Sequence, residues 1–176
     1  MTDTPAEPPP DDKDWTWVLD RPCPECGFGA VLEREDLPGR VRAAAAKWPA
    51  VLSRPDATTR PSALVWSPLE YGCHVRDVFR LFAERVTLML ERDDPRFANW
   101  DQDETAVAEH YRDQDPAVVA AQILQAGEAL AGVFERVGSG EWERAGTRSN
   151  GSRFTIETLG RYCLHDVDHH AWDVGA

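Results

Sequence analysis

Three of the five histidines in this chain have a spacing that suits a bound metal ion. His165 and His169 lie near the chain end at an i,i+4 spacing, which on a helix stacks two imidazoles on the same face. His74 lies in a separate segment of helical periodicity and is expected to reach the pair from across a bundle. Three neutral imidazoles with an open coordination position describe a catalytic-type site for zinc, nickel or a similar ion. We therefore predict one divalent metal bound by His74, His165 and His169, although isolated pairs of this spacing are more often exposed or merely hydrogen-bonded.

Aspartates at helical spacing from these histidines are candidates to orient the rings. Asp77 follows His74 by three residues, and Asp166 and Asp168 flank the pair in the same way. A carboxylate that accepts a hydrogen bond from the outer imidazole nitrogen orients a metal ligand, whereas the alternative is a solvated surface charge. His170 points about 100° away from His169 on a helix, so it is a bystander or a substitute ligand. Tyr162 is placed either in the pocket or in the core.

The four cysteines are a rival signal for metal binding. Cys23 and Cys26 form a C-x-x-C segment, and Cys73 and Cys163 lie far from it in the chain. Gathered together, the four thiols would suit a structural Cys₄ zinc site. A second C-x-x-C is missing, and a redox role would favour a βαβ context that the chain lacks. Structural or incidental use, a redox role and zinc binding therefore all remain open.

Four amphipathic segments must position these side chains. We predict long helices over residues 38–53, 67–92, 116–137 and about 155–172, with a short helix over residues 104–112. Ser67, Pro68 and Glu70 form a capping box with a proline at the first helical position, so Ser67 is a helix cap and not a nucleophile. Pro49 is expected to kink or shorten the first helix. Residues 141–154 are expected to form a loop, with room for a short hairpin.

This pattern predicts an all-α protein built as an antiparallel-type four-helix bundle. We assign residues 23–176 to the bundle domain and residues 1–22 to a flexible acidic tail rich in proline. Trp15, Trp17 and Val18 of that tail are candidates to pack on the domain as a strap.

Charge and composition limit the partners of the chain. It has 19 Lys and Arg against 31 Asp and Glu, a formal net charge of −12 over 176 residues. This balance disfavours nucleic acid and anionic membranes. No apolar run is expected to approach the ~20 residues of a membrane helix. The acidic N-terminus lacks a secretion signal, so we expect a cytoplasmic protein with reduced thiols and a small-molecule substrate. A homodimer is plausible because the apolar faces of bundles often pair.

Two segments resemble the DinB-like superfamily. They are Trp66-Ser67-Pro68-Leu69-Glu70-Tyr71-Gly72-Cys73-His74-Val75-Arg76-Asp77 and Leu164-His165-Asp166-Val167-Asp168-His169-His170, and the resemblance spans residues 38–174. It implies a four-helix bundle that holds a divalent metal through three histidines, one on the second helix and two on the last. These match His74, His165 and His169. The family includes mycothiol and bacillithiol S-transferases, mycothiol-dependent maleylpyruvate isomerases and members of unknown activity. The Cys-Pro-Glu-Cys-Gly start looks like its actinobacterial branch, which implies mycothiol as the thiol.

A three-histidine ion would lower the pKa of a bound thiol or water and so supply a nucleophile near neutral pH. We therefore expect a metal-dependent thiol S-transferase that acts on small electrophiles. The alternatives are a metal-dependent hydrolase and a non-catalytic metal-binding protein of stress response or interaction. Loop position suggests substrate contacts from Arg76, Trp100, Asp101 and Arg153.

Overall fold

The computed structural model describes Pro8 and residues 14–29 and 32–176. Four long helical segments form a bundle: α1 (Leu37–Ala46) with its continuation α2 (Trp48–Leu52), α3 (Pro68–Glu91), α5 (Pro116–Glu135) and α6 (Ile156–Asp173). The shorter elements are α4 (Gln102–Ala108), the 3₁₀ helices η1 (Thr16–Leu19), η2 (Arg34–Asp36) and η3 (Tyr111–Asp113), and the antiparallel strands β1 (Ala145–Thr147) and β2 (Arg153–Thr155). The predicted all-α bundle is confirmed, with a small hairpin between α5 and α6.

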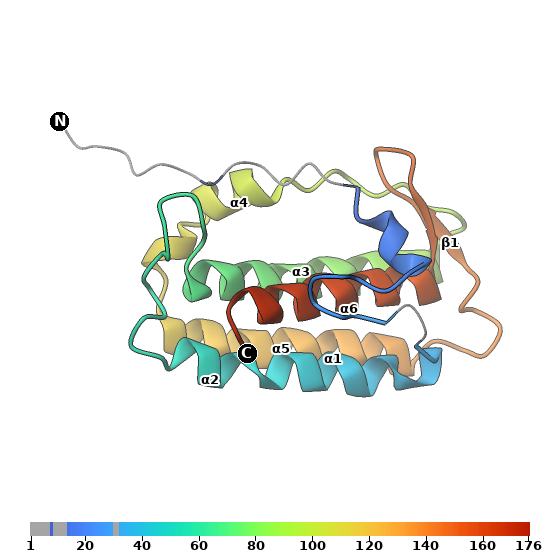
Figure 1. Ribbon diagram of the computed structural model, residues 1–176. Helices are drawn as coiled ribbons and strands as arrows, with labels where there is room; N and C mark the ends of the chain where they lie inside the picture. Colours follow the sequence, from blue (N-terminus) through green and yellow to red (C-terminus); the bar gives the residue numbers. More distant parts are fainter. Residues whose placement is uncertain (1–7, 9–13, 30–31) are drawn as a thin grey trace.

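Each long helix packs against two others: α1 and α3 both contact α5, and both also contact α6. Figure 1 shows that α3 and α5 run in the same direction, because the connection between them returns along the bundle and carries α4. The helices α3 and α5 are therefore parallel, whereas an antiparallel arrangement was expected. A long crossover connection makes a parallel pair possible, whereas a short loop forces an antiparallel one.

Side-chain caps set where three of the long helices begin. Ser67 accepts a hydrogen bond from the Glu70 backbone N–H, and the Glu70 carboxylate accepts one from the Ser67 backbone N–H, which confirms the predicted capping box. Asp115 caps α5 from its N-terminal side with Pro116 at the first helical position. Thr155 and Thr158 form the equivalent reciprocal cap of α6.

The first predicted helix is divided in the structure. α1 ends at Ala46, and α2 starts at Trp48 with Pro49 within its first turn. Proline has no backbone N–H to continue the ladder of the preceding turn, so the chain breaks at Lys47 instead of continuing as one helix. Trp48 is fully buried at this break and anchors both pieces in the core.

The segment before the bundle packs on α6. Val18 is fully buried, and the Trp15 ring lies 5.4 Å from the His165 ring. The Arg161 guanidinium donates a hydrogen bond to the Leu19 carbonyl at 2.9 Å. The expected strap of Trp15, Trp17 and Val18 is therefore present. The part of the assigned tail at residues 1–7 and 9–13 lies outside the described residues.

Among the described residues, α5 is the helix that is long and apolar enough to cross a membrane, by length and composition alone. This corrects the expectation that no apolar run approaches that length. In the structure α5 packs between α1 and α3, and Val119, Ile123 and Leu130 are fully buried. The apolar residues on the face of α5 that contacts α1 and α3 therefore fill the core.

Candidate metal centre and cavity

Two histidines from different helices converge on one carboxylate at the α3–α6 interface. Nε2 of His74 on α3 lies 3.2 Å from Oδ1 of Asp166 on α6, and Nε2 of His170 lies 3.8 Å from the same oxygen. Ligand atoms around a tetrahedral zinc ion lie about 3.4 Å apart, given zinc–nitrogen distances of about 2.0–2.1 Å. The three side chains therefore form a donor set that fits a divalent ion.

Packing holds the His74 ring of this group. His74 is fully buried, stacks on Trp100 at 5.5 Å and 19°, and lies 5.7 Å from the Trp66 ring. Its Nδ1 has no hydrogen-bond partner among the described residues. Aromatic walls on the ring, and not a carboxylate on its outer nitrogen, therefore orient this ligand.

The His170 ring has the opposite arrangement. Its Nδ1 lies 2.9 Å from Oδ2 of Asp173, three residues along α6. A carboxylate on the outer nitrogen favours the tautomer that keeps the proton on Nδ1 and leaves the Nε2 lone pair available for a metal. The Tyr71 ring lies 5.0 Å away and limits rotation of the imidazole.

Asp166 is ionised in this arrangement. Burial opposes the negative charge, but the neighbouring His74, His170 and His165 and the hydrogen bond with His74 outweigh it, so the pKa of Asp166 falls to about 2. The group therefore offers one carboxylate and two imidazole donors. That set occurs both in catalytic zinc sites and in sites for iron.

The centre opens onto a cavity of about 710 Å³. Asp166 and His170 are part of its lining, whereas His74 lies behind them. The walls come from α3, α6, the connection that leads into α4, the β1–β2 hairpin and the N-terminal segment. This volume suits a small molecule with a polar group directed to the metal ligands.

Arg85 brings a positive charge into this cavity. Its residue is only 8% exposed, and it forms no ion pair with a carboxylate in the described part of the chain. The guanidinium lies over the rings of Phe82 and Phe97 at 5.6 and 5.3 Å. Burial and the nearby charge of Arg148 lower the pKa of Arg85 to about 10, so it remains charged at neutral pH. A buried cation of this kind favours a ligand with an anionic group.

The structure divides the three predicted metal ligands between two groups. His74 lies with Asp166 and His170, whereas His165 and His169 lie with Cys23 and Cys26. Asp166 was predicted to orient a ligand, and His170 to be a bystander or a substitute ligand. Both instead place ligand atoms beside His74. The four cysteines are not gathered into one cluster, because Cys73 instead directs its thiol to the Tyr111 carbonyl at 3.7 Å.

The other two predicted supporting aspartates bind cations or a phenol. Asp77 accepts hydrogen bonds from Arg76 at 2.8 Å and from the Tyr111 hydroxyl at 2.6 Å. Asp168 faces α1, where it pairs with Arg40 at 3.2 Å and Lys47 at 3.1 Å. Both carboxylates therefore tie helices and connections of the bundle together.

The predicted pocket residues Tyr162, Trp100 and Asp101 all line the cavity. Tyr162 also stacks on Phe82 at 6.3 Å and 19°, and the Asp101 side chain caps α4. The two other suggested contacts lie elsewhere. Arg76 donates hydrogen bonds to Gln114 and Gln122 as well as to Asp77. Arg153 pairs with Asp94 at 3.2 Å.

Two features of the site were not recognised in the sequence. Asp166 and His170 have the same i,i+4 spacing as His165 and His169, so the sequence contains two overlapping ligand pairs on one helix. That repeated spacing was the available signal. Arg85 gave no such signal, because its burial depends on how the 92–115 connection and the hairpin cover α3.

Comparison with known proteins agrees with this architecture. The family model of the DinB superfamily matches residues 39–174. The chain therefore belongs to the DinB superfamily. Among solved structures it is similar to YfiT from Bacillus subtilis, described as a probable metal-dependent hydrolase with an unusual four-helix bundle topology. The TM-score is 0.70 at 16% identity, over 79% of this chain and 82% of that one, so the likeness establishes the fold. No curated protein matches the chain.

Proposed function

We propose that this chain is a metal-dependent enzyme whose divalent ion is held by His74, Asp166 and His170. The observation that carries the proposal is the convergence of both histidine nitrogens on Asp166 Oδ1 at the edge of the cavity. This arrangement keeps the ligand pattern implied by the superfamily, one histidine on α3 and an i,i+4 pair on α6. It differs in which of the two overlapping pairs faces α3 and in the ligand set, because Asp166 supplies a carboxylate where the superfamily pattern implies a third histidine. Zinc is the favoured ion.

A divalent ion bound there would lower the pKa of a coordinated thiol or water and supply a nucleophile at neutral pH. The protein residues have separate tasks. His170 is held by Asp173, His74 is held by its aromatic neighbours, and the Asp166 carboxylate offsets part of the positive charge of the ion. The reaction we favour is transfer of a low-molecular-weight thiol, with mycothiol as the leading candidate, to a small electrophile.

Arg85 and Arg148 support a substrate that carries an anionic group. Both line the cavity, and Arg148 donates a hydrogen bond to the Tyr162 hydroxyl at 3.4 Å. An anionic group near these guanidinium groups would place the rest of a small ligand toward the metal ligands. Nucleic acid is disfavoured as the substrate for separate reasons: the cavity is too small for a polymer, and the chain is acidic overall.

Hydrolysis is the second candidate, because the structurally similar YfiT is described as a probable metal-dependent hydrolase. One experiment separates the two. Protein purified without a histidine tag and loaded with zinc is incubated with monochlorobimane and either mycothiol, bacillithiol or cysteine, and in parallel with p-nitrophenyl acetate without a thiol. Conjugation that depends on metal and thiol supports transfer, whereas ester cleavage without a thiol supports hydrolysis. If neither reaction is accelerated across a panel of electrophiles and esters, a non-catalytic metal-binding protein is favoured.

A further inference from the structure

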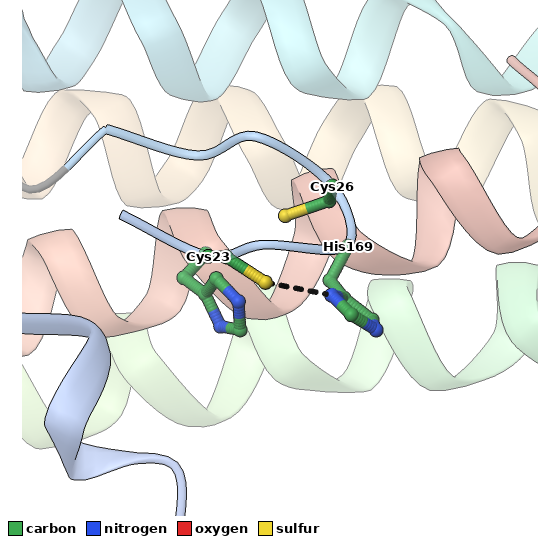
Figure 2. A group of neighbouring side chains, drawn as sticks. Cys23, Cys26 and His169 are labelled. Carbon is green, nitrogen blue, oxygen red and sulfur yellow. Dashed lines mark hydrogen bonds between the residues drawn. The ribbon is translucent and has the colours of Figure 1, made fainter. Parts of the chain in front are cut away.

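A second set of metal-ligand side chains lies on the neighbouring face of α6. Ligand atoms of Cys23, Cys26, His165 and His169 all lie within 4.8 Å of one another. The Cys23 sulfur is 3.7 Å from Nδ1 of His169, and Figure 2 marks this contact with the Cys26 side chain beside it. Three of the four residues are buried and Cys26 is partly exposed, and none of the thiols is in a disulfide.

The backbone around the cysteines forms a tight turn that brings the thiols together. The Gly27 backbone N–H donates to the Cys23 carbonyl at 3.0 Å, and the Cys23 N–H donates to the Phe28 carbonyl at 3.0 Å. Gly27 has a φ of 72°, a left-handed conformation that glycine adopts without steric cost. The turn therefore places Cys26 and Cys23 against α6, where His165 and His169 are one helical turn apart.

The hydrogen bonding of the two imidazoles points to an ion. A nitrogen of His165, Nε2, is buried with no hydrogen-bond partner among the described residues, and the residue is only 3% exposed. A buried polar atom without a partner is costly, and coordination in this cluster would give the ring one. His169 directs Nδ1 to Cys23 and Nε2 to the Glu25 carboxylate at 3.4 Å. Histidines that bind a metal have this arrangement: the lone pair of one ring nitrogen faces the ion, and the other ring nitrogen donates to a carboxylate.

We propose that Cys23, Cys26, His165 and His169 bind a structural zinc ion, separate from the ion of the cavity. The C-x₂-C and H-x₃-H spacings match those of Cys₂His₂ zinc sites, in which four protein ligands close the coordination sphere. Binding forms two zinc–sulfur and two zinc–nitrogen bonds and releases the two thiol protons to solvent. With no open position, this ion has a structural role.

The position of the site defines what the ion stabilises. Its cysteines belong to the N-terminal segment and its histidines to the last helix, so the ion cross-links the two ends of the domain. Trp15 and Glu25 of that segment line the cavity. The zinc site therefore fixes one wall of the cavity, whatever reaction the cavity supports.

Cobalt replacement tests the proposal, because thiolate ligands give a sulfur-to-cobalt charge-transfer band that imidazole and carboxylate ligands do not. Full-length reduced protein without a tag is stripped of metal and titrated with Co²⁺. Wild type is expected to develop the band with a tetrahedral visible spectrum. The double variant Cys23→Ser/Cys26→Ser is expected to lose the band, while His170→Ala and the control Cys73→Ala keep it. Absence of the band in wild type, or its persistence in the double variant, would overturn the proposal.

The same variants distinguish this proposal from the proposed cavity metal. Zinc content is expected to fall by one ion per chain in the double variant. If His170→Ala instead has the same zinc content as wild type, the proposed cavity centre fails while the cysteine site stands. Hydrogen–deuterium exchange provides a readout that is independent of activity. Exchange in residues 14–29 is expected to rise in the double variant and to stay slow in α3 and α5. Unchanged exchange in residues 14–29, or a Cys23–Cys26 disulfide in place of metal binding, would count against a structural zinc.

Discussion

His165 and Asp166 are adjacent in the chain but belong to different ligand groups. Asp166 Oδ1 lies 3.2 Å from His74 on α3, whereas the His165 ring lies 5.2 Å from His169 and 5.6 Å from Phe28 in the N-terminal segment. One residue turns a helix by about 100°, so neighbouring positions on α6 face different partners. The last helix thus carries two candidate metal sites side by side.

Replacing His170 with Ala is expected to weaken metal binding at the cavity centre by at least ~10–100-fold, because one of three donors is removed. The fold should be retained, since His170 is only partly buried. Zinc content after dialysis and isothermal titration measure the change. The matched control is His110→Asn, because His110 is exposed and has a φ of 51°, which asparagine tolerates. Equal zinc affinity in both variants would contradict the assignment of His170.

Arg85→Met is expected to reduce turnover of anionic substrates while leaving the stability of the fold unchanged or higher. The guanidinium is buried without a carboxylate partner in the described structure, so an apolar residue of similar length removes a desolvation cost. Thermal denaturation and a comparison of KM for charged and neutral electrophiles check the two effects. A clear loss of stability would show that Arg85 is primarily a structural residue.

Tyr111→Phe is expected to lower the free energy of unfolding by about 1–3 kcal/mol, because it removes a hydrogen bond to the charged Asp77 carboxylate. That bond is 2.6 Å long, and Asp77 also pairs with Arg76. Urea denaturation measures the loss. Zinc affinity should not change, because Asp77 contacts Arg76 and Tyr111 and not the proposed metal ligands. A parallel fall in zinc affinity would instead link Asp77 to His74, as predicted from their spacing.

Gly127→Ala is expected to destabilise the bundle by about 1–3 kcal/mol through overpacking. A Cβ at Gly127 would lie 2.7 Å from the Ala45 Cβ of α1, a contact that requires the helices to separate. Gly132→Ala on the same helix is the control, since its Cβ would meet only Arg136 Nη1, at 3.9 Å. This second change should stabilise α5 by about 0.5–1 kcal/mol through helix propensity. Similar melting temperatures for the two variants would argue against close α1–α5 packing.

The buried Glu70–Arg60 pair is expected to make stability depend on pH. Burial opposes ionisation of Glu70, but Arg60 and Ser67 outweigh it, so the folded-state pKa lies below its ordinary value of about 4.3. The stabilisation is therefore present above about pH 4.3 and is lost as pH falls through the lower folded-state pKa. Glu70→Gln should cost about 3 kcal/mol at neutral pH, and the difference from wild type should shrink in acid. Denaturation of both proteins in chelator, at several pH values, checks this. A constant difference would contradict it.

The sequence was sufficient to predict a four-helix bundle, but not the parallel direction of α3 and α5 or the grouping of the ligands. Caps such as Ser67 with Glu70, and apolar residues at helical spacing, are local signals, and they placed all four long helices. The choice between the 165/169 and 166/170 pairs depends on the rotation of α6 about its axis. That rotation is set by packing between helices that are distant in the chain. The contact between Cys23 and His169 joins residues 146 positions apart, and no local pattern specifies it.

This long-range contact has a consequence for the order in which the domain assembles during synthesis. Cys23 and Cys26 are synthesised well before α6, the helix that carries His165 and His169. The N-terminal segment therefore has no docking surface until α6 has folded against α1 and α3. The contact between Cys23 and His169 joins residues 146 positions apart, and contacts of such large sequence separation form late because closing the loop between them costs entropy. A nascent chain that stops short of α6 would present the cysteine turn without its histidine partners, and the cavity is completed only after α6 has been made.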